Sequence, residues 1–388
     1  MSPRQDIAAA RRIVIKLGTH VITHEGAGLA LGRLCSLVEG VADVHRQGRE
    51  IILVSSGAVG MGQRALGLTR RPDSLGLRQA CAAVGQGQLM ALYSQNFGQL
   101  GIKVAQVLLT QEDLGERDRA LCVRTTLTRL LELGVVPILN ENDSVSVREL
   151  VEYRRGQGQD SPALEFGDND GLSARVAVAL DADLLVLLTD VDGLYTANPR
   201  SDPHARRIAE LADIDDATLG LATGSSAGGT GGMSSKLEAA RLASRAGIAV
   251  LITSGHHPGA LERALAGEDM GTLVQPSNRR SAHRRQIAAG TPSRGALFVN
   301  DGAIAALAER KASLLPVGLV RVDGEFSRGD VVEIRDGSGR VHGRGLVNYD
   351  AGDCRQLIGR QSAEIASTLG WRGYDALITR DNLVLSEV

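Results

Sequence analysis

Two lysines stand in glycine-containing turns where they could neutralise the charge of a phosphate. Lys16 ends the apolar run RIVIK, and the nearby Gly18 would let a phosphate approach the backbone closely. Lys236 follows the loop Gly228–Ser235 (GGTGGMSS) and precedes a helical pattern, so it would lie at a helix N-terminus, which favours anions. Each has a plainer alternative: Lys16 as a surface lysine at a strand end, and the loop as a flexible linker.

Two turns rich in carboxylates and amides follow or precede other regular patterns. Asn140–Asp143 (NEND) follows VVPIL, and Gly167–Gly171 (GDNDG) opens the helical pattern LSARVAVAL. Rows of polar side chains are costly beside a core unless they bind a ligand or one another. An Asx turn or simple helix capping is the alternative explanation. We interpret both turns as parts of a site for a small charged substrate.

Two further turns carry hydroxyl groups. Ser55–Gly60 (SSGAVG) comes directly after EIILV, where it would form an anion-binding nest or only a tight turn with a serine N-cap. Thr189–Thr196 (TDVDGLYT) follows LLVLL and would begin a turn beside a nucleotide, or would be a plain hairpin at Asp192-Gly193.

Phosphoryl transfer is the chemistry that this set of residues favours. Lysines, carboxylates between them and small residues around them suit a transition state that spreads negative charge over the moving phosphoryl group. The GxxxxGK[ST] order of a P-loop is absent, because Lys236 follows two serines. No GxGxxG follows the first apolar run, which disfavours a dinucleotide enzyme.

The elements that must position these turns form an alternating pattern from about residue 11 to 275. The predicted strands are Arg12–Lys16, Glu50–Val54, Lys103–Leu109, Val135–Leu139, Leu184–Thr189 and Ile248–Thr253. The predicted helices include Leu77–Phe97, Arg119–Leu133, Leu172–Leu180 and Ser235–Ala246. Apolar strands alternating with helices indicate a mostly parallel sheet with helices on both sides. Ligands bind such sheets at the carboxyl ends of the strands.

The pattern changes from about residue 293. Short strands with turn signals are predicted at Gly318–Val322, Asp330–Arg335 and Val341–Val347, with helical patterns at Ala303–Lys311 and Ser362–Leu369. We therefore predict an α/β domain over residues 1–275, a linker over 276–291 that contains the basic run Arg279–Arg285, and a small β-rich domain over 292–388.

Composition excludes several classes of protein. Hydrophobic residues make up 43% and charged residues 23%, as in folded soluble proteins, and the formal net charge of −2 disfavours a nucleic-acid-coating protein. No apolar run approaches the roughly 20 residues that span a bilayer. The N-terminus lacks the pattern of a signal peptide, so we expect a cytoplasmic protein without membrane partners.

These motifs resemble those of a known family. The order IVIKLGT, VSSGAVGMG, VVPILNENDSV, FGDNDGLSA, LLTDVDGLYTANPR and GTGGMSSKLEAA is similar to that of the glutamate 5-kinases, which have the amino-acid kinase fold. The segments SLLPVGLVRVDGEFSRGDVVEI and TRDNLVL resemble the PUA domain that many bacterial members carry. The resemblance implies a three-layer sandwich with a mostly parallel central sheet, followed by a PUA-like pseudobarrel.

The resemblance also implies a reaction and a set of roles. ATP and L-glutamate would give ADP and γ-glutamyl phosphate with Mg²⁺, which is the first step of proline synthesis. The implied catalytic residues are Lys16, Lys236 and Asp170; the implied glutamate-binding residues are Ser56, Asp143 and Asn169, with Asp168 close by. The implied ATP-binding residues are Lys16, Thr189, Asp190, Thr230, Gly231, Gly232, Met233, Ser234, Ser235 and Lys236. From residue type alone, Asp143 suits an ammonium group, while Ser56 and Asn169 suit carboxylates.

Partners and regulation follow from the resemblance only. Family members are inhibited by proline and form tetramers or dimers, and the PUA-like domain implies an RNA partner. Two departures stand out. Arg148–Leu164 lengthens the segment between the NEND and GDND motifs, which bears on proline sensitivity. Thr379 stands where His is expected, which bears on RNA binding.

Three rival functions remain at this point. A kinase of acetylglutamate, aspartate, carbamate or UMP is disfavoured by the GDND and GTGGMSSK pair and the PUA-like tail. An RNA-binding or RNA-modifying protein is disfavoured by the net charge and by an aromatic content of only 3%, which leaves few stacking platforms. An inactive kinase-like protein is disfavoured by the presence of Lys16, Asp170 and Lys236 together.

Overall fold

The computed structural model describes residues 3–24, 28–70, 72–145, 169–199, 201–222, 232–277, 293–310, 312–371 and 374–385. Contacts divide the chain into two compact units: Met1–Gly115 with Thr126–Arg279, and Glu116–Thr125 with Arg280–Val388. The first unit is α/β and the second is rich in strands. The domain limits at residues 275 and 292 stay a prediction. Within the described ranges, no helix is long and apolar enough to cross a membrane.

The first unit is built on an eight-stranded sheet in the order β5-β6-β4-β1-β7-β9-β10-β8. Its strands are β1 (Arg12–Leu17), β4 (Glu50–Ser55), β5 (Val104–Leu109), β6 (Val136–Glu141), β7 (Leu184–Thr189), β8 (Glu210–Leu211), β9 (Ala249–Ser254) and β10 (Thr272–Val274). Neighbours are parallel except β9 and β10, which are antiparallel. A separate hairpin pairs β2 (Thr23–His24) with β3 (Gly28–Leu29). The mostly parallel sheet expected from the sequence is confirmed.

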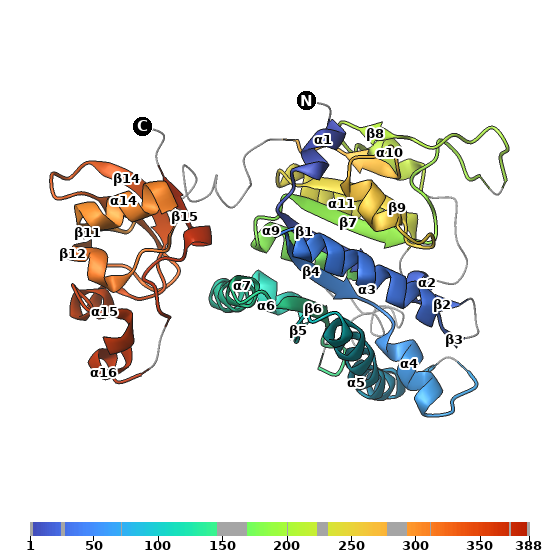
Figure 1. Cartoon of the computed structure of the whole chain (residues 1–388), viewed down its shortest axis with the longest axis horizontal. Helices are drawn as coiled ribbons and strands as arrows, with labels where there is room; N and C mark the ends of the chain where they lie inside the picture. The colour runs from blue at the N-terminus through green and yellow to red at the C-terminus, as the bar shows by residue number, and fades with distance from the viewer. Residues whose placement is uncertain are drawn as a thin grey trace, which may run out of the picture. The chain divides into compact units, whose positions relative to one another are not determined.

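Helices cover both faces of this sheet (Figure 1). They are α1 (Pro3–Ala8), α2 (Thr19–Ile22), α3 (Leu31–Arg46), α4 (Ala58–Ala65), α5 (Leu75–Gln99), α6 (Gln111–Gly115), α9 (Asn169–Ala179), α10 (Asp216–Gly220), α11 (Met233–Arg245) and α12 (Ala260–Leu265). The helix α7 (Arg117–Glu132) has residues in both units. Ile13, Ile15 and Leu17 of β1 share a buried cluster with residues of α3, α5 and α12. Successive strand residues face opposite sides, so Lys16 faces the other layer, where α9 contacts β1 and α11 contacts β7 and β9.

Two glycines bring α4 and α5 into close contact. A Cβ on Gly85 would lie 1.8 Å from the carbonyl oxygen of Ala58, and one on Gly62 would lie 1.8 Å from that of Cys81. These separations are far below van der Waals contact, so only glycine fits at either position. Because α4 directly follows the turn Ser55–Gly57, this packing also positions that turn.

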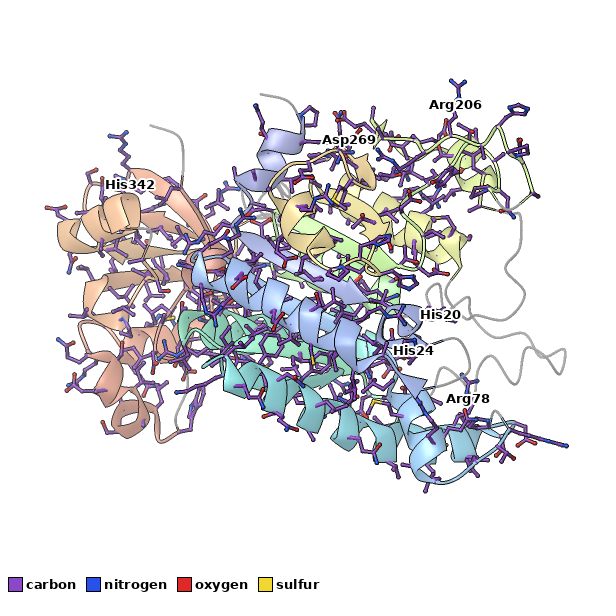
Figure 2. The ribbon with its side chains drawn as sticks, turned by 45° about the vertical axis from the view of Figure 1, so that its right-hand side comes forward. His20, His24, Arg78, Arg206, Asp269 and His342 are labelled. Atoms are coloured by element: carbon purple, nitrogen blue, oxygen red, sulfur yellow. The ribbon has the colours of Figure 1, made fainter. Side chains whose placement is uncertain are left out.

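The N-terminal helix α1 is attached to the sheet edge through Arg4, which is 8% exposed. Its guanidinium donates to the carbonyl oxygens of Met270 at 2.8 Å and Ala209 at 3.0 Å. It also lies 2.9 Å from the carboxylate of Asp269, which is labelled in Figure 2. The attachment ties α1 to the turn before β10 and to the residue before β8.

The second unit contains a five-stranded sheet in the order β12-β11-β13-β14-β15. Its strands are β11 (Gly295–Val299), β12 (Leu319–Gly324), β13 (Val331–Arg335), β14 (Val341–Leu346) and β15 (Leu383–Leu385). Its helices are α14 (Asp301–Arg310), α15 (Ala351–Gln356) and α16 (Ile365–Leu369), with 3₁₀ turns at Pro316–Gly318, Ser362–Glu364 and Arg380–Asn382. Leu297 and Val299 of β11 are buried with Val332 and Ile334 of β13. The β-rich domain is confirmed, although its strands β11 and β15 were not predicted.

Candidate active site

The carboxyl ends of five strands lie along one edge of the first sheet. Leu17 of β1 is in register with Ser55 of β4 and with Leu188 of β7, and Thr189 is in register with Ser254 of β9. β6 also runs parallel to β4 and ends at Glu141. This arrangement places the turns singled out in the sequence at the edge where ligands bind.

Asp170 joins the two lysines. Its Oδ1 lies 2.6 Å from Lys16 Nζ, and its Oδ2 lies 3.2 Å from Lys236 Nζ. Asp170 is fully buried and each lysine is 4% exposed. Buried charges lose their hydration and persist only when they are paired. The two ammonium groups and the carboxylate between them form a buried charged cluster at the strand ends.

Helix geometry adds to this positive field. Asp170 lies in the first turn of α9, where the helix dipole favours a carboxylate. Lys236 lies in the first turn of α11, where its charge and the helix dipole have the same sign. Ser235 Oγ donates to Asp170 Oδ2 at 2.9 Å, which holds the carboxylate against α11. The start of α11 therefore combines an ammonium group with the backbone N–H groups of a first helical turn, as an anion site requires.

Asn169 connects the ends of β4 and β6. Its Nδ2 lies 3.1 Å from the carbonyl oxygen of Ser55, 3.0 Å from Ser56 Oγ and 2.9 Å from Asn140 Oδ1. Its Oδ1 is buried and has no hydrogen-bond partner among the described residues. The nitrogen side of the amide is thus saturated by the protein, whereas the oxygen side lacks a donor. Asn169 therefore differs from the expectation that it donates to a carboxylate.

Asp190 follows the end of β7 beside Lys236 and His20. Burial alone would raise its pKa, but the hydroxyl of Thr189, which donates to Asp190 Oδ1 at 3.0 Å, acts in the other direction. A backbone N–H and the charges of His20 and Lys236 also favour the carboxylate, so the pKa of Asp190 is lowered overall. Asp190 is accordingly an anion at neutral pH, able to accept hydrogen bonds.

Of the remaining candidate residues, some lie in the described part of the chain and others do not. Asp143 lies two residues beyond β6 and is partly buried. Gly232 is the N-cap of α11, and Met233, Ser234 and Ser235 form its first turn. Residues outside the described part of the chain are Asp168, Thr230, Gly231, the segment Arg148–Leu164 and the basic run Arg279–Arg285.

Two residues of α5 that were not singled out in the sequence support the site. Gln86 Oε1 accepts a hydrogen bond from Asn140 Nδ2 at 2.9 Å, and Tyr93 OH lies 2.8 Å from Ser55 Oγ. Gln86 is 9% exposed and Tyr93 is fully buried. Their one sequence signal is helical spacing: both belong to the stripe that carries the buried Leu89 and Phe97. Gln86 is a polar residue within that stripe.

Magnesium has few protein ligands in the described part of the site. No cluster of three or more His, Cys, Asp or Glu that could hold a metal ion occurs among the described residues. Both oxygens of Asp170 are already paired with lysines. Mg²⁺ commonly keeps several waters and binds phosphate oxygens with few carboxylates. The residues present therefore fit an ion that arrives with ATP rather than one held in a protein cage.

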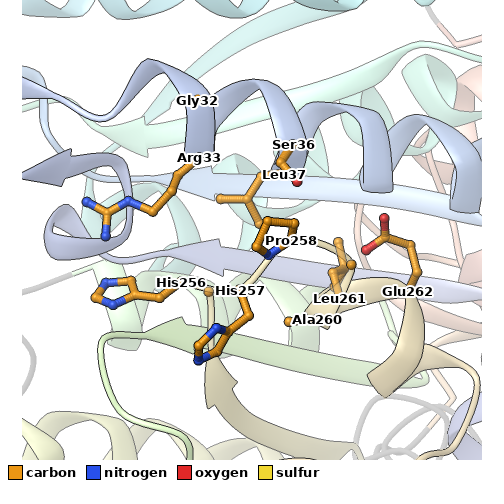
Figure 3. A pocket seen from close by; sticks show the side chains of 12 residues that line it. Gly32, Arg33, Ser36, Leu37, His256, His257, Pro258, Ala260, Leu261 and Glu262 are labelled. Atoms are coloured by element: carbon orange, nitrogen blue, oxygen red, sulfur yellow. The ribbon is translucent and has the colours of Figure 1, made fainter.

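A hollow on the first unit lies apart from these residues. It is lined by the start of α3, including Arg33 and Ser36, and by the segment from His256 to Glu262 (Figure 3). In Figure 3 Arg33 and His256 lie at one end of the hollow and Glu262 lies at the other. None of the candidate site residues lines it.

Comparison with known proteins identifies the class. The model of the amino acid kinase family matches residues 11–254, and that of the PUA domain matches residues 295–369. Carbamate kinase from Giardia lamblia bound to AMP-PNP aligns with 69% of this chain and 99% of its own, at 18% identity and a TM-score of 0.48. That likeness is too distant to add to the assignment. The chain belongs to the amino acid kinase family.

Similarity to curated proteins shows with which group of the amino acid kinase family this chain belongs. Glutamate 5-kinase of Gloeobacter violaceus is 48% identical over 377 residues, which cover 96% of this chain and 98% of the relative. The glutamate 5-kinases of Trichormus variabilis and Myxococcus xanthus are 47% and 45% identical, covering 97% and 98% of this chain and 100% and 98% of their own. Within the family, the chain groups with the glutamate 5-kinases.

Proposed function

We propose that this chain transfers the γ-phosphoryl group of ATP to the γ-carboxylate of L-glutamate, giving γ-glutamyl phosphate and ADP. The observation that carries the proposal is the buried carboxylate of Asp170, which holds Lys16 and Lys236 beside a polar substrate site. A carboxylate oxygen of glutamate forms the new bond to phosphorus, and the bond between phosphorus and the β,γ-bridging oxygen breaks. This reaction is the first step of proline synthesis.

The two lysines neutralise the phosphoryl group as it moves. Charge in this transition state lies mainly on the phosphoryl oxygens, so catalysis depends on positioning and on nearby cations. Asp170 is the third catalytic residue, because its two oxygens hold the lysines on either side. No protein nucleophile is required, since the substrate carboxylate attacks directly.

Glutamate binds at the ends of β4 and β6. Ser56 Oγ accepts from Asn169 Nδ2, so its own proton can be donated to a carboxylate oxygen of the substrate. Asn169 Oδ1 and the carboxylate of Asp143 suit the α-ammonium group. Asp168 precedes Asn169 in the chain and completes the proposed set.

ATP binds along the ends of β7 and α11. Thr189, Asp190 and the loop Thr230–Lys236 form the proposed nucleotide site, with Lys16 opposite. The backbone N–H groups of the first turn of α11 suit its phosphates. Mg²⁺ bound to the phosphates would supply further charge neutralisation.

Regulation and assembly are proposed from the resemblance to the glutamate 5-kinase family alone. We propose proline as a feedback inhibitor, a homotetramer or homodimer, and a cytoplasmic location. RNA binding through the PUA domain has only the general property of that domain in its support. Kinase assays with added proline test the inhibition, and light scattering gives the molar mass of the oligomer. A filter-binding titration with RNA at several salt concentrations tests RNA binding.

The activity is tested by trapping its product. Acyl phosphates react with hydroxylamine to give a hydroxamate and phosphate. We expect γ-glutamyl hydroxamate to form when glutamate, ATP and Mg²⁺ are all present, and none to form when any of them is omitted. Release of ADP without hydroxamate would show that the chain hydrolyses ATP but does not phosphorylate glutamate.

A further inference from the structure

A chain of hydrogen bonds runs from the middle of α5 to the substrate side of the site. Gln86 Oε1 accepts from Asn140 Nδ2 at 2.9 Å. Asn140 Oδ1 in turn accepts from Asn169 Nδ2 at 2.9 Å. Gln86 is 9% exposed and Asn140 is 4% exposed, so water competes little for these bonds. The three carboxamides form a single ordered series.

Backbone groups fix the direction of this series. The N–H of Glu141 donates to Asn140 Oδ1 at 2.9 Å, and a backbone N–H can only donate. The carbonyl oxygen of Ser55 lies 3.1 Å from Asn169 Nδ2, and a carbonyl can only accept. Neither amide can be turned over without placing two donors or two acceptors face to face. The oxygen of Asn169 must therefore point away from Asn140.

The result of this direction is a buried oxygen without a donor. Asn169 Oδ1 has no hydrogen-bond partner among the described residues, although it is out of contact with solvent. An unsatisfied buried acceptor is unfavourable, which indicates that a donor joins it in the working complex. The α-ammonium of an amino acid is such a donor, whereas a carboxylate would be repelled.

We propose that Gln86 is a positioning residue that, through Asn140, holds the oxygen of Asn169 toward the α-ammonium of the substrate. The inference rests on the proposed function, because it takes Asn169 as part of the glutamate site. Gln86 touches neither substrate nor nucleotide. It acts by keeping the Asn140 amide from rotating, which in turn keeps Asn169 Nδ2 facing the protein.

The placement of Gln86 on α5 suits this role. Val136 and Ile138 of β6 belong to the core that α5 covers, so Asn140, two residues further on, faces α5 as well. On β4, Ser55 likewise follows Ile51 and Leu53, and its hydroxyl meets Tyr93, which lies about two helical turns beyond Gln86 on α5. One rigid helix thus supports both strand ends that carry the substrate site.

The test compares Gln86→Met with Gln86→Glu in the full-length protein. Met has a similar volume but its thioether sulfur is only a weak acceptor, whereas Glu keeps an acceptor oxygen at the same place. We expect the KM for glutamate to rise roughly tenfold in Gln86→Met, as for loss of one buried hydrogen bond. The kcat and the KM for ATP should stay close to wild type, and Gln86→Glu should restore most of the affinity for glutamate.

A second ligand isolates the ammonium group. Glutarate has both carboxylates of glutamate but no amine, and its inhibition constant against glutamate can be measured in each variant. We expect Gln86→Met to leave this constant unchanged while the KM for glutamate rises. An equal loss for both ligands, or a Gln86→Glu variant as impaired as Gln86→Met, would overturn the proposal.

Two further variants control for stability. Asn96 lies on α5, as Gln86 does, and its Oδ1 accepts a hydrogen bond from Cys35 of α3, away from the site. Asn96→Leu removes that bond and should leave the KM for glutamate unchanged. Should Gln86→Met not fold, Gln86→Ala removes the acceptor with a smaller side chain, and the same split between ligands is expected. A wild-type protein that does not phosphorylate glutamate defeats the proposed function. An active wild type with no selective effect in the variants defeats only the role of Gln86.

Discussion

At the scale of single residues, the site depends on a set of buried charges. Lys16 and Lys236 both lie against the carboxylate of Asp170, and all three are largely removed from water. Such a set is stable only with excellent geometry, and removing one member leaves a buried charge without its partner. The two ammonium groups are positioned to stabilise the phosphoryl group in the transition state.

The geometry at Lys236 predicts that arginine cannot replace it. A planar guanidinium is larger and does not present a compact charge to Asp170 and a phosphate together. We expect Lys236→Arg to lower kcat about 100-fold, the usual scale for losing one positioned electrostatic group. Steady-state kinetics measure this effect, with the exposed Lys103→Arg as a matched control that should remain active. Near-normal turnover of Lys236→Arg would show that the phosphate site lies elsewhere.

The lowered pKa of Asp190 predicts a change in acid stability. A carboxyl group with a lower pKa in the folded than in the unfolded state stabilises the fold above its unfolded pKa. That contribution disappears as the pH falls through the folded pKa. Thr189→Val removes the hydroxyl that favours the carboxylate, so the folded pKa should rise and acid unfolding should begin at higher pH. Circular dichroism across an acid titration measures the pH at which each variant unfolds. Thr189→Ser keeps the hydroxyl and should unfold at the same pH as the wild type. Identical unfolding curves for Thr189→Val and the wild type would contradict the prediction.

The sequence could predict the site residues at the strand ends, but not the residues of neighbouring elements that hold them in place. Lys16, Asp170 and Lys236 stand in turns whose glycines and carboxylates are unusual, and the structure brings them together. Gln86 lies within a helical stripe where its type alone indicates nothing about Asn140. The orientation of Asn169 depends on backbone groups of Ser55 and Glu141, which no spacing along the chain discloses.

At the scale of elements, the crossing of α4 and α5 predicts opposite effects for two neighbouring glycines. Gly85→Ala would push a methyl group against Ala58, so we expect a loss of about 1–3 kcal/mol in the free energy of unfolding. It should also raise the KM for glutamate, because α4 follows the Ser56 turn. Gly87→Ala meets no atom within 4 Å and should stabilise α5 by about 0.5–1 kcal/mol. Urea unfolding of both variants tests the pair, and equal effects would contradict the close packing.

Elements were predictable where their patterns were long and uniform. β7 has the predicted bounds Leu184–Thr189, because a strand buried on both faces is continuously apolar. β10 is only three residues long and antiparallel to β9, so its pairing depends on tertiary contacts. β11 was not predicted, because its run GALFV has no alternation of apolar and polar residues to mark a half-buried strand.

At the scale of the whole molecule, the two units predict separable roles. The residues that hold the lysines and the amide series belong to the first unit. We therefore expect a chain that ends at Thr291 to keep kinase activity, although its affinity for ligands can differ. Activity and circular dichroism of the truncated chain measure this. A folded fragment without any activity would show that the second unit contributes to the site.

The most direct test of the account is ATP consumption by the purified chain across four acceptors: glutamate, acetylglutamate, aspartate and UMP, each with and without proline. The buried oxygen of Asn169 and the lysine pair on Asp170 together predict turnover with glutamate, which has a free α-ammonium. Little or none is expected with acetylglutamate and UMP, which lack that group. Aspartate keeps the ammonium but is one methylene shorter, so its side-chain carboxylate should not reach the lysine pair and its turnover should also be low. Turnover with acetylglutamate or UMP but none with glutamate would contradict the proposed substrate and the assignment of the amide site.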